Sequence, residues 1–206
     1  MAPHNSDMTL SPSDPTGRKA ALRAQALARR DALAIDDRLI WDEAVCERTL
    51  ALLDEVAAPL RDESASVTVS AYWPMGSEAD PRPILEALHA RDVALCLPAI
   101  VDRRMIFRRW APWEPIAPGG FGTLVPEAHR PEVTPMIVLA PLLAFDRRGY
   151  RIGYGKGYYD AALARLGPVA SIGIAYARQE IDAVPDEPHD RRLGWVVTES
   201  GAIACG

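Results

Sequence analysis

Residues 67–97, VTVSAYWPMGSEADPRPILEALHARDVALCL, follow a pattern of strand, helix and strand. Segments 67–72 and 93–97 are short and rich in apolar or β-branched residues, which is typical of strands. Between them, residues 81–91 open with proline and carry apolar residues at helical spacing, which predicts a helix. This order predicts a β-α-β unit.

Further apolar segments extend the unit in both directions. Upstream, residues 18–33 favour a helix by propensity, and Asp36 is expected to cap a second helix that ends near Ala58. Downstream, residues 158–166 predict another helix, and four segments predict strands, namely 104–110, 136–141, 169–176 and 193–199. The alternation predicts an α/β fold, with a single three-layer α/β/α domain of the Rossmann-like type.

Composition places the chain among globular proteins. Of its 206 residues, 49% are hydrophobic and 25% charged, which is ordinary for one domain. The formal net charge of -5 gives no global positive field, so we expect neither a nucleic-acid partner nor a membrane surface. The longest apolar run, residues 136–145, is also too short to span a bilayer.

The cysteines and the N-terminal segment agree with this class. Cys46, Cys96 and Cys205 are odd in number and far apart, so neither a disulfide framework nor a zinc site is indicated, and the cytoplasm is the expected compartment. Residues 1–16 are polar and rich in Pro and Ser, so we expect a flexible tail followed by one domain over residues 17–206. We expect a monomer.

The segment RIGYGKGYYD, residues 151–160, predicts an anion site. It matches neither the P-loop pattern nor the dinucleotide-binding pattern. Its glycines nevertheless let backbone N–H groups approach a ligand, and a helix starting near Gly157 would present its positive end, with Tyr158 and Asp160 in its first turn. Alternatively, the glycines form only a tight turn and Asp160 only offsets the helix dipole.

The lysines are unusual, because 21 of the 23 basic residues are arginine and only Lys19 and Lys156 are lysine. An ammonium and a guanidinium are not equivalent at a phosphate, so these positions predict phosphate contacts, with chance as the alternative. Lys19 also shares one helical stripe with Arg23 and Arg30. Such a stripe indicates an anionic counterpart or, alternatively, a solvated face.

Residues 72–83, YWPMGSEADPRP, follow the first strand of the unit, where open α/β sheets bind ligands. Trp73 and Met75 offer an apolar surface and Glu78 a carboxylate acceptor, which together fit a heterocycle. A plain turn with a surface charge explains the same residues. Residues 111–135 form a long loop rich in Pro and Gly, which either lines a ligand site or is a rigid surface connection.

Residues 184–199 contain Asp190, between His189 and a predicted strand. Two carboxylates from separate loops suit Mg²⁺, so Asp160 and Asp190 are the candidate pair, whereas a solvated loop is the alternative. His189 could act as a general base, but no GxSxG or HExxH motif accompanies it. Nucleophilic catalysis by the protein therefore has little support.

Four features together resemble the 5-formyltetrahydrofolate cyclo-ligase family: Lys19 with Arg23, YWPMGSEAD, APLLAFDRRGYRIGYGKGYYDAAL and VPDEPHD. The resemblance runs from about residue 18 to residue 199. It implies a fold related to ribose-5-phosphate isomerase and the coenzyme A transferases, with ATP and Mg²⁺ as cofactors. It also implies a reaction in which the formyl oxygen of the folate is phosphorylated, the neighbouring amine attacks the activated carbon and phosphate leaves.

The resemblance assigns roles to matching residues. It implies that Lys156 and Arg151 are catalytic and that Asp160 and Asp190 bind magnesium. The folate would contact Trp73, Glu78, Tyr154 and Tyr158. The ATP phosphates would be bound by Lys19, Arg23, Arg151, Gly153, Gly155, Lys156, Gly157, Tyr158 and Tyr159. The loop GFGTLVPE, residues 120–127, departs from the family pattern, and we predict no site residue there.

Two other functions remain open at this point. One is an enzyme with the same ATP site and a different substrate, such as a formylated heterocycle in thiamine salvage. The other is a non-catalytic folate-binding or RNA-associated relative. The presence of Lys19, Arg151, Lys156, Asp160 and Asp190 together speaks against the second, as does the acidic composition.

Overall fold

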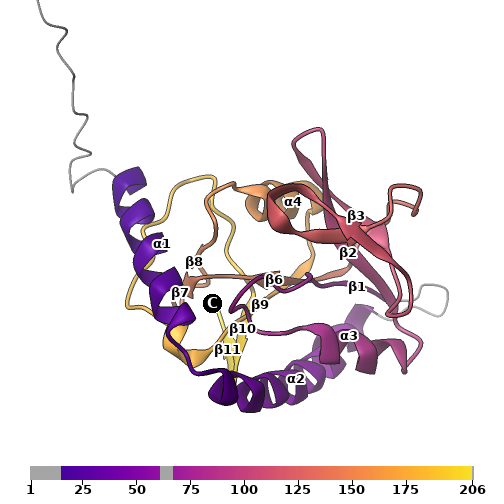
Figure 1. The fold of residues 1–206 in the computed structure, drawn as a ribbon, viewed down its shortest axis with the longest axis horizontal. Helices are drawn as coiled ribbons and strands as arrows, with labels where there is room; N and C mark the ends of the chain where they lie inside the picture. Colours follow the sequence, from indigo (N-terminus) through magenta and orange to yellow (C-terminus); the bar gives the residue numbers. More distant parts are fainter. Residues whose placement is uncertain (1–14, 61–66, 206) are drawn as a thin grey trace, which may run out of the picture.

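The computed structural model describes residues 15–60 and 67–205, which fold around one central sheet (Figure 1). Its seven strands lie in the order β11-β10-β9-β6-β1-β2-β3. Five neighbouring strands are parallel, and β3 and β11 pair antiparallel at the two edges. The strands are β1 (Thr68–Ser70), β2 (Ala94–Val101), β3 (Arg104–Arg109), β6 (Ile137–Pro141), β9 (Ala170–Ile174), β10 (Trp195–Thr198) and β11 (Gly201–Ala204).

The predicted β-α-β unit is confirmed. Strand β1 pairs parallel with β2, with Thr68 opposite Ala94 and Ser70 opposite Cys96, and α3 (Arg82–His89) connects them. Apolar side chains on one face of α3, Ile84, Leu85 and Leu88, are buried against the sheet. Burial of this face therefore holds α3 against the part of the sheet that contains these two strands.

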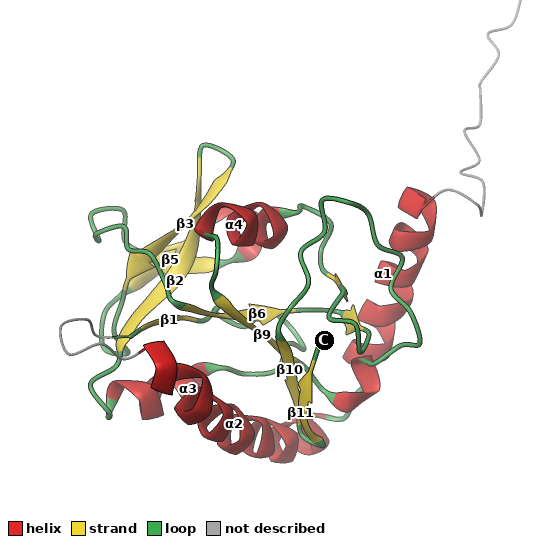
Figure 2. Ribbon diagram, turned by 180° about the vertical axis from the view of Figure 1, so that it is seen from behind, coloured by secondary structure: helices red, strands yellow, loops and turns green. Residues whose placement is uncertain are grey.

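Helices cover both faces of the sheet (Figure 2). On one face, α2 (Ile35–Ala57) and α3 pack against the larger apolar cluster, which includes Leu53 and Ile137. On the other face, α4 (Tyr158–Leu166) packs against a second cluster through Ala162 and Leu163. The fold is thus mixed α/β with a central, mostly parallel sheet.

Helix α1 (Pro15–Asp31) lies beside the small two-stranded sheet of β7 (Ala144–Phe145) and β8 (Arg151–Ile152). Its buried Ala26 packs in a third cluster with Leu143 and Ile152. The helix includes residues 15 and 16, so the predicted boundary at residue 17 falls inside it, and the rest of the predicted tail, residues 1–14, lies outside the described residues.

The start of α2 differs from the prediction. Its N-cap is Ala34 in an extended conformation without a side-chain cap, and Asp36 lies inside the first helical turn. A carboxylate there still complements the positive end of the helix, although it does not close the first turn by a hydrogen bond.

Several short elements were not predicted. The Pro/Gly-rich loop contains an antiparallel pair, β4 (Ile116–Pro118) and β5 (Leu124–Pro126), joined by the 3-10 turn η2 (Gly120–Gly122). Two further 3-10 turns are η1 (Ala58–Leu60) and η3 (Ala177–Gln179). These segments are too short for periodicity to reveal them. Within residues 15–60 and 67–205, no helix combines the length and apolarity that a membrane span needs.

Candidate active site

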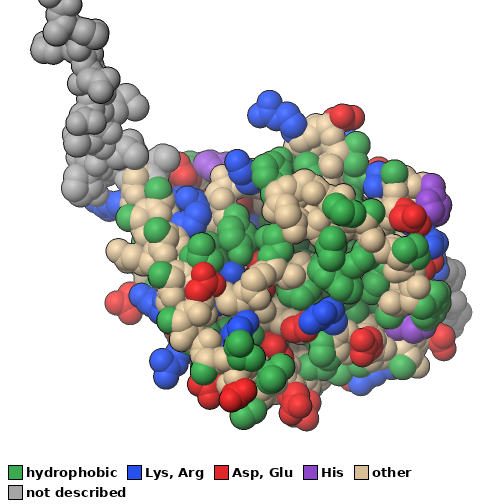
Figure 3. Space-filling model, viewed as in Figure 1, with side chains coloured by type: hydrophobic (Ala, Val, Ile, Leu, Met, Phe, Trp, Pro, Cys, Tyr) green, Lys and Arg blue, Asp and Glu red, His purple; other side chains and the backbone are tan. Residues whose placement is uncertain are grey.

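A cavity of about 800 Å³ opens beside the carboxyl ends of β1 and β6. The chain leaves β1 toward β2 and leaves β6 toward β9, in opposite directions along the sheet and over opposite faces. Ligands of open α/β sheets bind at such a reversal, because the diverging loops leave a crevice. Every residue assigned to the site from sequence lines this cavity. Hydrophobic side chains gather on the face of the molecule drawn in Figure 3.

The glycine loop has the bare backbone that the sequence predicts. Gly155 and Gly157 have φ angles of +83° and +66°, and Gly157 is the N-cap of α4. The Nε of Arg23 donates to the carbonyl oxygen of Gly153 at 2.8 Å. A Cβ on Gly155 would lie 2.7 Å from Arg23 Cζ and would displace the end of the Arg23 side chain, and the φ of +83° independently favours glycine.

The base of this loop is held by a buried carboxylate. Asp146, fully buried in the turn between β7 and β8, accepts backbone hydrogen bonds from Arg148 at 3.0 Å and Val184 at 2.9 Å. In the same turn, Gly149 has a φ of +88°, and a Cβ there would lie 2.4 Å from the carbonyl oxygen of Leu193. The turn therefore fixes where Arg151 and the following glycines begin.

Two cations of the loop have different surroundings. Arg151 is largely buried, and its Nη2 donates to Oδ1 of Asp160 at 2.9 Å, whereas its Nη1 donates to the carbonyl oxygen of Arg191 at 2.7 Å. Lys156 is exposed, with its Nζ 5.2 Å from the centre of the Phe121 ring. The first is thus fixed in place, while the second carries a charge that is available to a ligand.

Lys19 meets two protein carboxylates. Its Nζ lies 2.7 Å from Glu187 Oε2 and 2.5 Å from Asp190 Oδ2. Burial lowers the pKa of Lys19, but hydrogen bonds and charges from Asp190 and Glu187 outweigh it, so the pKa is raised. The basic stripe of α1 was predicted to face an anion. At Lys19 the structure supplies that anion from the protein, through Glu187 and Asp190.

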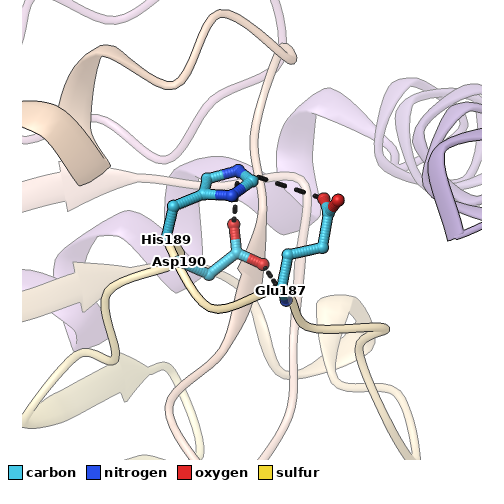
Figure 4. Close-up of side chains that lie close together, drawn as sticks. All are labelled: Glu187, His189 and Asp190. Carbon is cyan, nitrogen blue, oxygen red and sulfur yellow. Dashed lines mark hydrogen bonds and ion pairs between the residues drawn. The ribbon is translucent and has the colours of Figure 1, made fainter.

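Asp160 and Asp190, the predicted metal ligands, lie in neighbouring parts of the cavity wall but have different partners. Asp190 belongs to a cluster with Glu187 and His189, whose donor atoms lie within 4.8 Å of one another (Figure 4). Asp160 lies outside this cluster and accepts hydrogen bonds at Oδ1 from Arg151 and from the backbone N–H of Arg191 at 3.0 Å. Because Arg191 follows Asp190 directly, both carboxylates still line the same wall of the cavity.

At the other end of the cavity lies a buried carboxylate with a free acceptor. Glu78 is 5% exposed, and its Oε2 accepts the backbone N–H of Met75 at 2.8 Å. Its Oε1 accepts no hydrogen bond from any residue that the structure describes and lies 3.9 Å from Nη1 of Arg30. Burial raises the pKa of Glu78. An unpaired buried acceptor is costly, so this atom is suited to a ligand N–H donor.

Aromatic rings surround this end. Trp73 packs edge-on against Trp110, with 5.9 Å between the ring centres. The hydroxyl of Tyr154 accepts from Arg30 Nη2 at 2.8 Å, and burial followed by the charge of Glu78 raises its pKa. The pKa of the Tyr159 hydroxyl is also raised, chiefly by burial. The cavity thus combines an apolar, aromatic end with a cationic end.

The sequence prediction missed part of the lining. We predicted no site residue in the segment 120–127, yet Phe121 and Leu124 line the cavity, and the centres of the Phe121 and Tyr158 rings lie 6.0 Å apart. The many prolines and glycines of the long loop were the available signal, and part of this loop lines the cavity. The burial of Arg30 was also missed, because helical spacing alone cannot separate it from Lys19 and Arg23.

Comparison with known proteins decides the family. The profile of the 5-formyltetrahydrofolate cyclo-ligase family matches residues 15–199. The chain belongs to this family. A 5-formyltetrahydrofolate cyclo-ligase of Mycolicibacterium smegmatis is 31% identical over 153 residues, which cover 66% of this chain and 75% of the relative. Membership favours the cyclo-ligase hypothesis over the two other functions that the sequence left open.

Solved structures of cyclo-ligase family proteins have the same fold. The 5,10-methenyltetrahydrofolate synthetase of Aquifex aeolicus is similar with a TM-score of 0.72 and 28% identity, covering 91% of this chain and 92% of that one. The Mycoplasma pneumoniae 5,10-methenyltetrahydrofolate synthetase gives a TM-score of 0.69 at 25% identity, covering 88% and 98%. Most of this chain thus has the fold of these two synthetases.

Proposed function

We propose that this protein converts 5-formyltetrahydrofolate to 5,10-methenyltetrahydrofolate with release of ADP and phosphate. The observation that carries the proposal is one cavity that joins a cation-lined glycine loop to a buried carboxylate with an unpaired oxygen. The ligase class implies ATP as the co-substrate. The two ends fit its two substrates, because polyphosphate needs cations and bare backbone, whereas a pterin needs an apolar slot and an acceptor.

The nucleotide end fits ATP. Lys19, Arg23, Arg151 and Lys156 line the cavity together with the glycine loop, and the first turn of α4, the positive end of the helix dipole, lines it too. Gly153, Gly155 and Gly157 permit backbone approach, while Tyr158 and Tyr159 flank the helix start. We assign Lys156 to the transferring phosphoryl group, because its charge faces the cavity without a protein carboxylate among its described contacts.

The folate end fits a reduced pterin. Glu78 Oε1 would accept an N–H of the ring, and Trp73 would provide an apolar face. Tyr154 and Tyr158 connect this end to the glycine loop. The formyl group would then lie between the two ends, near the phosphate-binding cations.

The carboxylates of Asp160 and Asp190 fit Mg²⁺, because hard oxygen donors near a phosphate site are what this ion prefers. We assign the metal to these two residues. When bound, magnesium would neutralise phosphate charge. Lys19 and Arg151 form ion pairs with the same two carboxylates.

The chemistry needs no protein nucleophile. The formyl oxygen attacks the terminal phosphorus of ATP, and the bond from that phosphorus to ADP breaks. The neighbouring folate amine then attacks the formyl carbon and loses its proton, the carbon–oxygen bond breaks and phosphate leaves. The protein's residues orient the two substrates and offset the phosphate charge, which fits a site of cations and backbone amides.

Three further assignments belong to the proposal. We infer a Rossmann-like three-layer domain of the ribose-5-phosphate isomerase and coenzyme A transferase type, supported by helices on both sheet faces. We also propose a monomer in the cytoplasm. Sedimentation of the purified protein tests the monomer, since a dimer at every protein concentration would contradict it.

The decisive experiment mixes purified protein, ATP, Mg²⁺ and 5-formyltetrahydrofolate and follows the methenyl absorbance. Product is expected only when ATP is present, with one ADP formed per methenyl group. A formylated thiamine-type heterocycle in place of the folate serves as the matched substrate control. Failure to form an ATP-dependent folate product would refute the proposed activity.

A further inference from the structure

Arg30 differs from the other cations of α1. It lies in the last turn of the helix, and its side chain is only 1% exposed, against 13% for Lys19. A guanidinium is expensive to bury unless its donors are satisfied. The hydrogen bonds of the Arg30 guanidinium therefore show why an arginine is buried here.

The guanidinium joins three segments that are far apart in the chain. Nε donates to Ser77 Oγ at 2.9 Å in the loop after β1, and Nη2 donates to the Tyr154 hydroxyl at 2.8 Å in the glycine loop. Nη1 reaches the carbonyl oxygen of Leu142, after β6, at 3.4 Å. These bonds leave from three different nitrogens of a planar group, whereas the ammonium of a lysine would have to reach all three acceptors from a single nitrogen, so lysine is expected to replace this residue poorly.

Arg30 is also the cation next to Glu78. Its Nη1 lies 3.9 Å from Glu78 Oε1, the oxygen without a hydrogen-bond partner, and Ser77, which precedes Glu78, is bound both to Arg30 and to Asp31. Burial raises the pKa of Glu78, whereas the Met75 N–H and the Arg30 charge act in the opposite direction. The Tyr154 hydroxyl also lowers the pKa of Glu78 by hydrogen bonding, while the charge of Glu78 in turn raises the pKa values of the buried Tyr72 and Tyr159 hydroxyls.

We propose that Arg30 is a positioning residue that sets the spacing of Glu78 and Tyr154 and thereby determines affinity for the folate. The inference rests on the assignment of these two residues to the folate in the proposed function. Arg30 holds the Glu78 loop through Ser77, holds Tyr154 through its hydroxyl, and leaves Glu78 Oε1 for the ligand. Lys19 and Arg23 serve the nucleotide end, so the two ends of α1 have different tasks.

The test compares Arg30→Met and Arg30→Lys with Arg29→Met, because Arg29 is its exposed neighbour on the same helix. Calorimetry without ATP gives the Kd for 5-formyltetrahydrofolate, and steady-state assays give both KM values. Arg30→Met is expected to weaken folate binding by about ten- to a hundredfold, since a hydrogen-bonded charge is lost. The KM for ATP should change by less than about threefold, and Arg29→Met should bind folate like the wild type.

A double-mutant cycle with Glu78→Gln separates this inference from the site assignment. If Arg30 acts through Glu78, Arg30→Met should cause a clearly smaller loss of affinity in the Glu78→Gln background. Additive losses, or an equal rise in both KM values, would overturn the role of Arg30. Normal folate affinity of Glu78→Gln itself would instead refute the assignment of Glu78. If Arg30→Met does not fold, Arg30→Lys replaces it in the cycle, and normal folate affinity there would contradict the proposal.

Discussion

The ammonium of Lys19 lies 2.5 Å from Asp190 Oδ2, which joins a residue assigned to ATP with a residue assigned to magnesium. Both side chains line the cavity, and Glu187 adds a second carboxylate at 2.7 Å from the same ammonium. Phosphate and a metal ion would each compete for one member of this ion pair. Binding of ATP with magnesium is therefore expected to exchange the protein's own pair for two new ones.

Removal of Lys19 should affect the nucleotide more than the folate. Lys19→Met is expected to raise the KM for ATP by about ten- to a hundredfold, because a charge-assisted contact with phosphate is lost. The raised pKa of Lys19 means that the side chain remains charged below its ordinary pKa of 10.5, so wild-type ATP affinity should show no titration of this group near neutral pH. Initial rates at varied ATP check both points, with Arg29→Met, at an exposed position of the same helix, as the control. A rise confined to the KM for folate would contradict the assignment.

Lys156 should be needed for turnover rather than for folate binding. Lys156→Ala is expected to lower kcat by at least about a hundredfold while the folate Kd stays within about threefold, because the charge acts on the transferring phosphoryl group. Lys156→Arg tests whether an ammonium is required in a chain that otherwise uses arginine. Single-turnover rates with bound folate provide the measurement. Equal loss of folate affinity and turnover in Lys156→Ala would argue against this role.

Asp160 has two possible tasks that one substitution can separate. Its Oδ1 accepts from Arg151, so it either binds magnesium or only orients that arginine. Asp160→Asn is expected to raise the Mg²⁺ concentration for half-maximal rate by about tenfold, because a charged ligand becomes neutral. Magnesium titration at saturating substrates measures this. An unchanged magnesium requirement with a higher KM for ATP would support orientation of Arg151 instead.

Gly155 and Gly153 form a matched pair for testing the loop. A Cβ on Gly155 would lie 2.7 Å from Arg23 Cζ at a φ of +83°, whereas a Cβ on Gly153 would meet nothing within 4 Å. Gly155→Ala should therefore raise the KM for ATP by about tenfold or more, with a smaller rise for Gly153→Ala. Thermal unfolding of both variants serves as the control for general loss of structure. Equal effects of the two alanines would show that the approach of Arg23 is unimportant.

The buried Glu78 carboxylate, which we assign to folate binding, should lower the free energy of unfolding at neutral pH. Its folded pKa is raised, mainly by burial, so the folded state binds the proton more tightly than the unfolded state. The free energy of unfolding contributed by Glu78 therefore rises as the pH falls through the folded pKa. Urea unfolding of wild type and Glu78→Gln should show wild type gaining relative stability between neutral pH and about pH 5. A constant difference would mean that the carboxylate is not under this strain.

Local sequence carried much of the fold. The order of strand, helix and strand over residues 67–97 and the helix that begins after Gly157 were predictable, because apolar periodicity and glycine and proline positions act over a few residues. The same is true of the glycine loop, whose positive φ angles follow from its glycines. Every residue that the sequence assigned to the site lines one cavity, whereas Arg30, Phe121 and Leu124 line it without having been assigned.

Packing settled the relationships between distant residues. Lys19, Arg23 and Arg30 share one helical stripe, yet Arg30 alone of the three is buried, and Glu187 joins Lys19 only because two segments 168 residues apart lie side by side. Phe121 likewise reaches Lys156 through a hairpin that periodicity does not reveal. Local patterns encode the elements and their chemistry, whereas the partners and burial of each charge depend on how the elements pack, which short-range propensity does not contain.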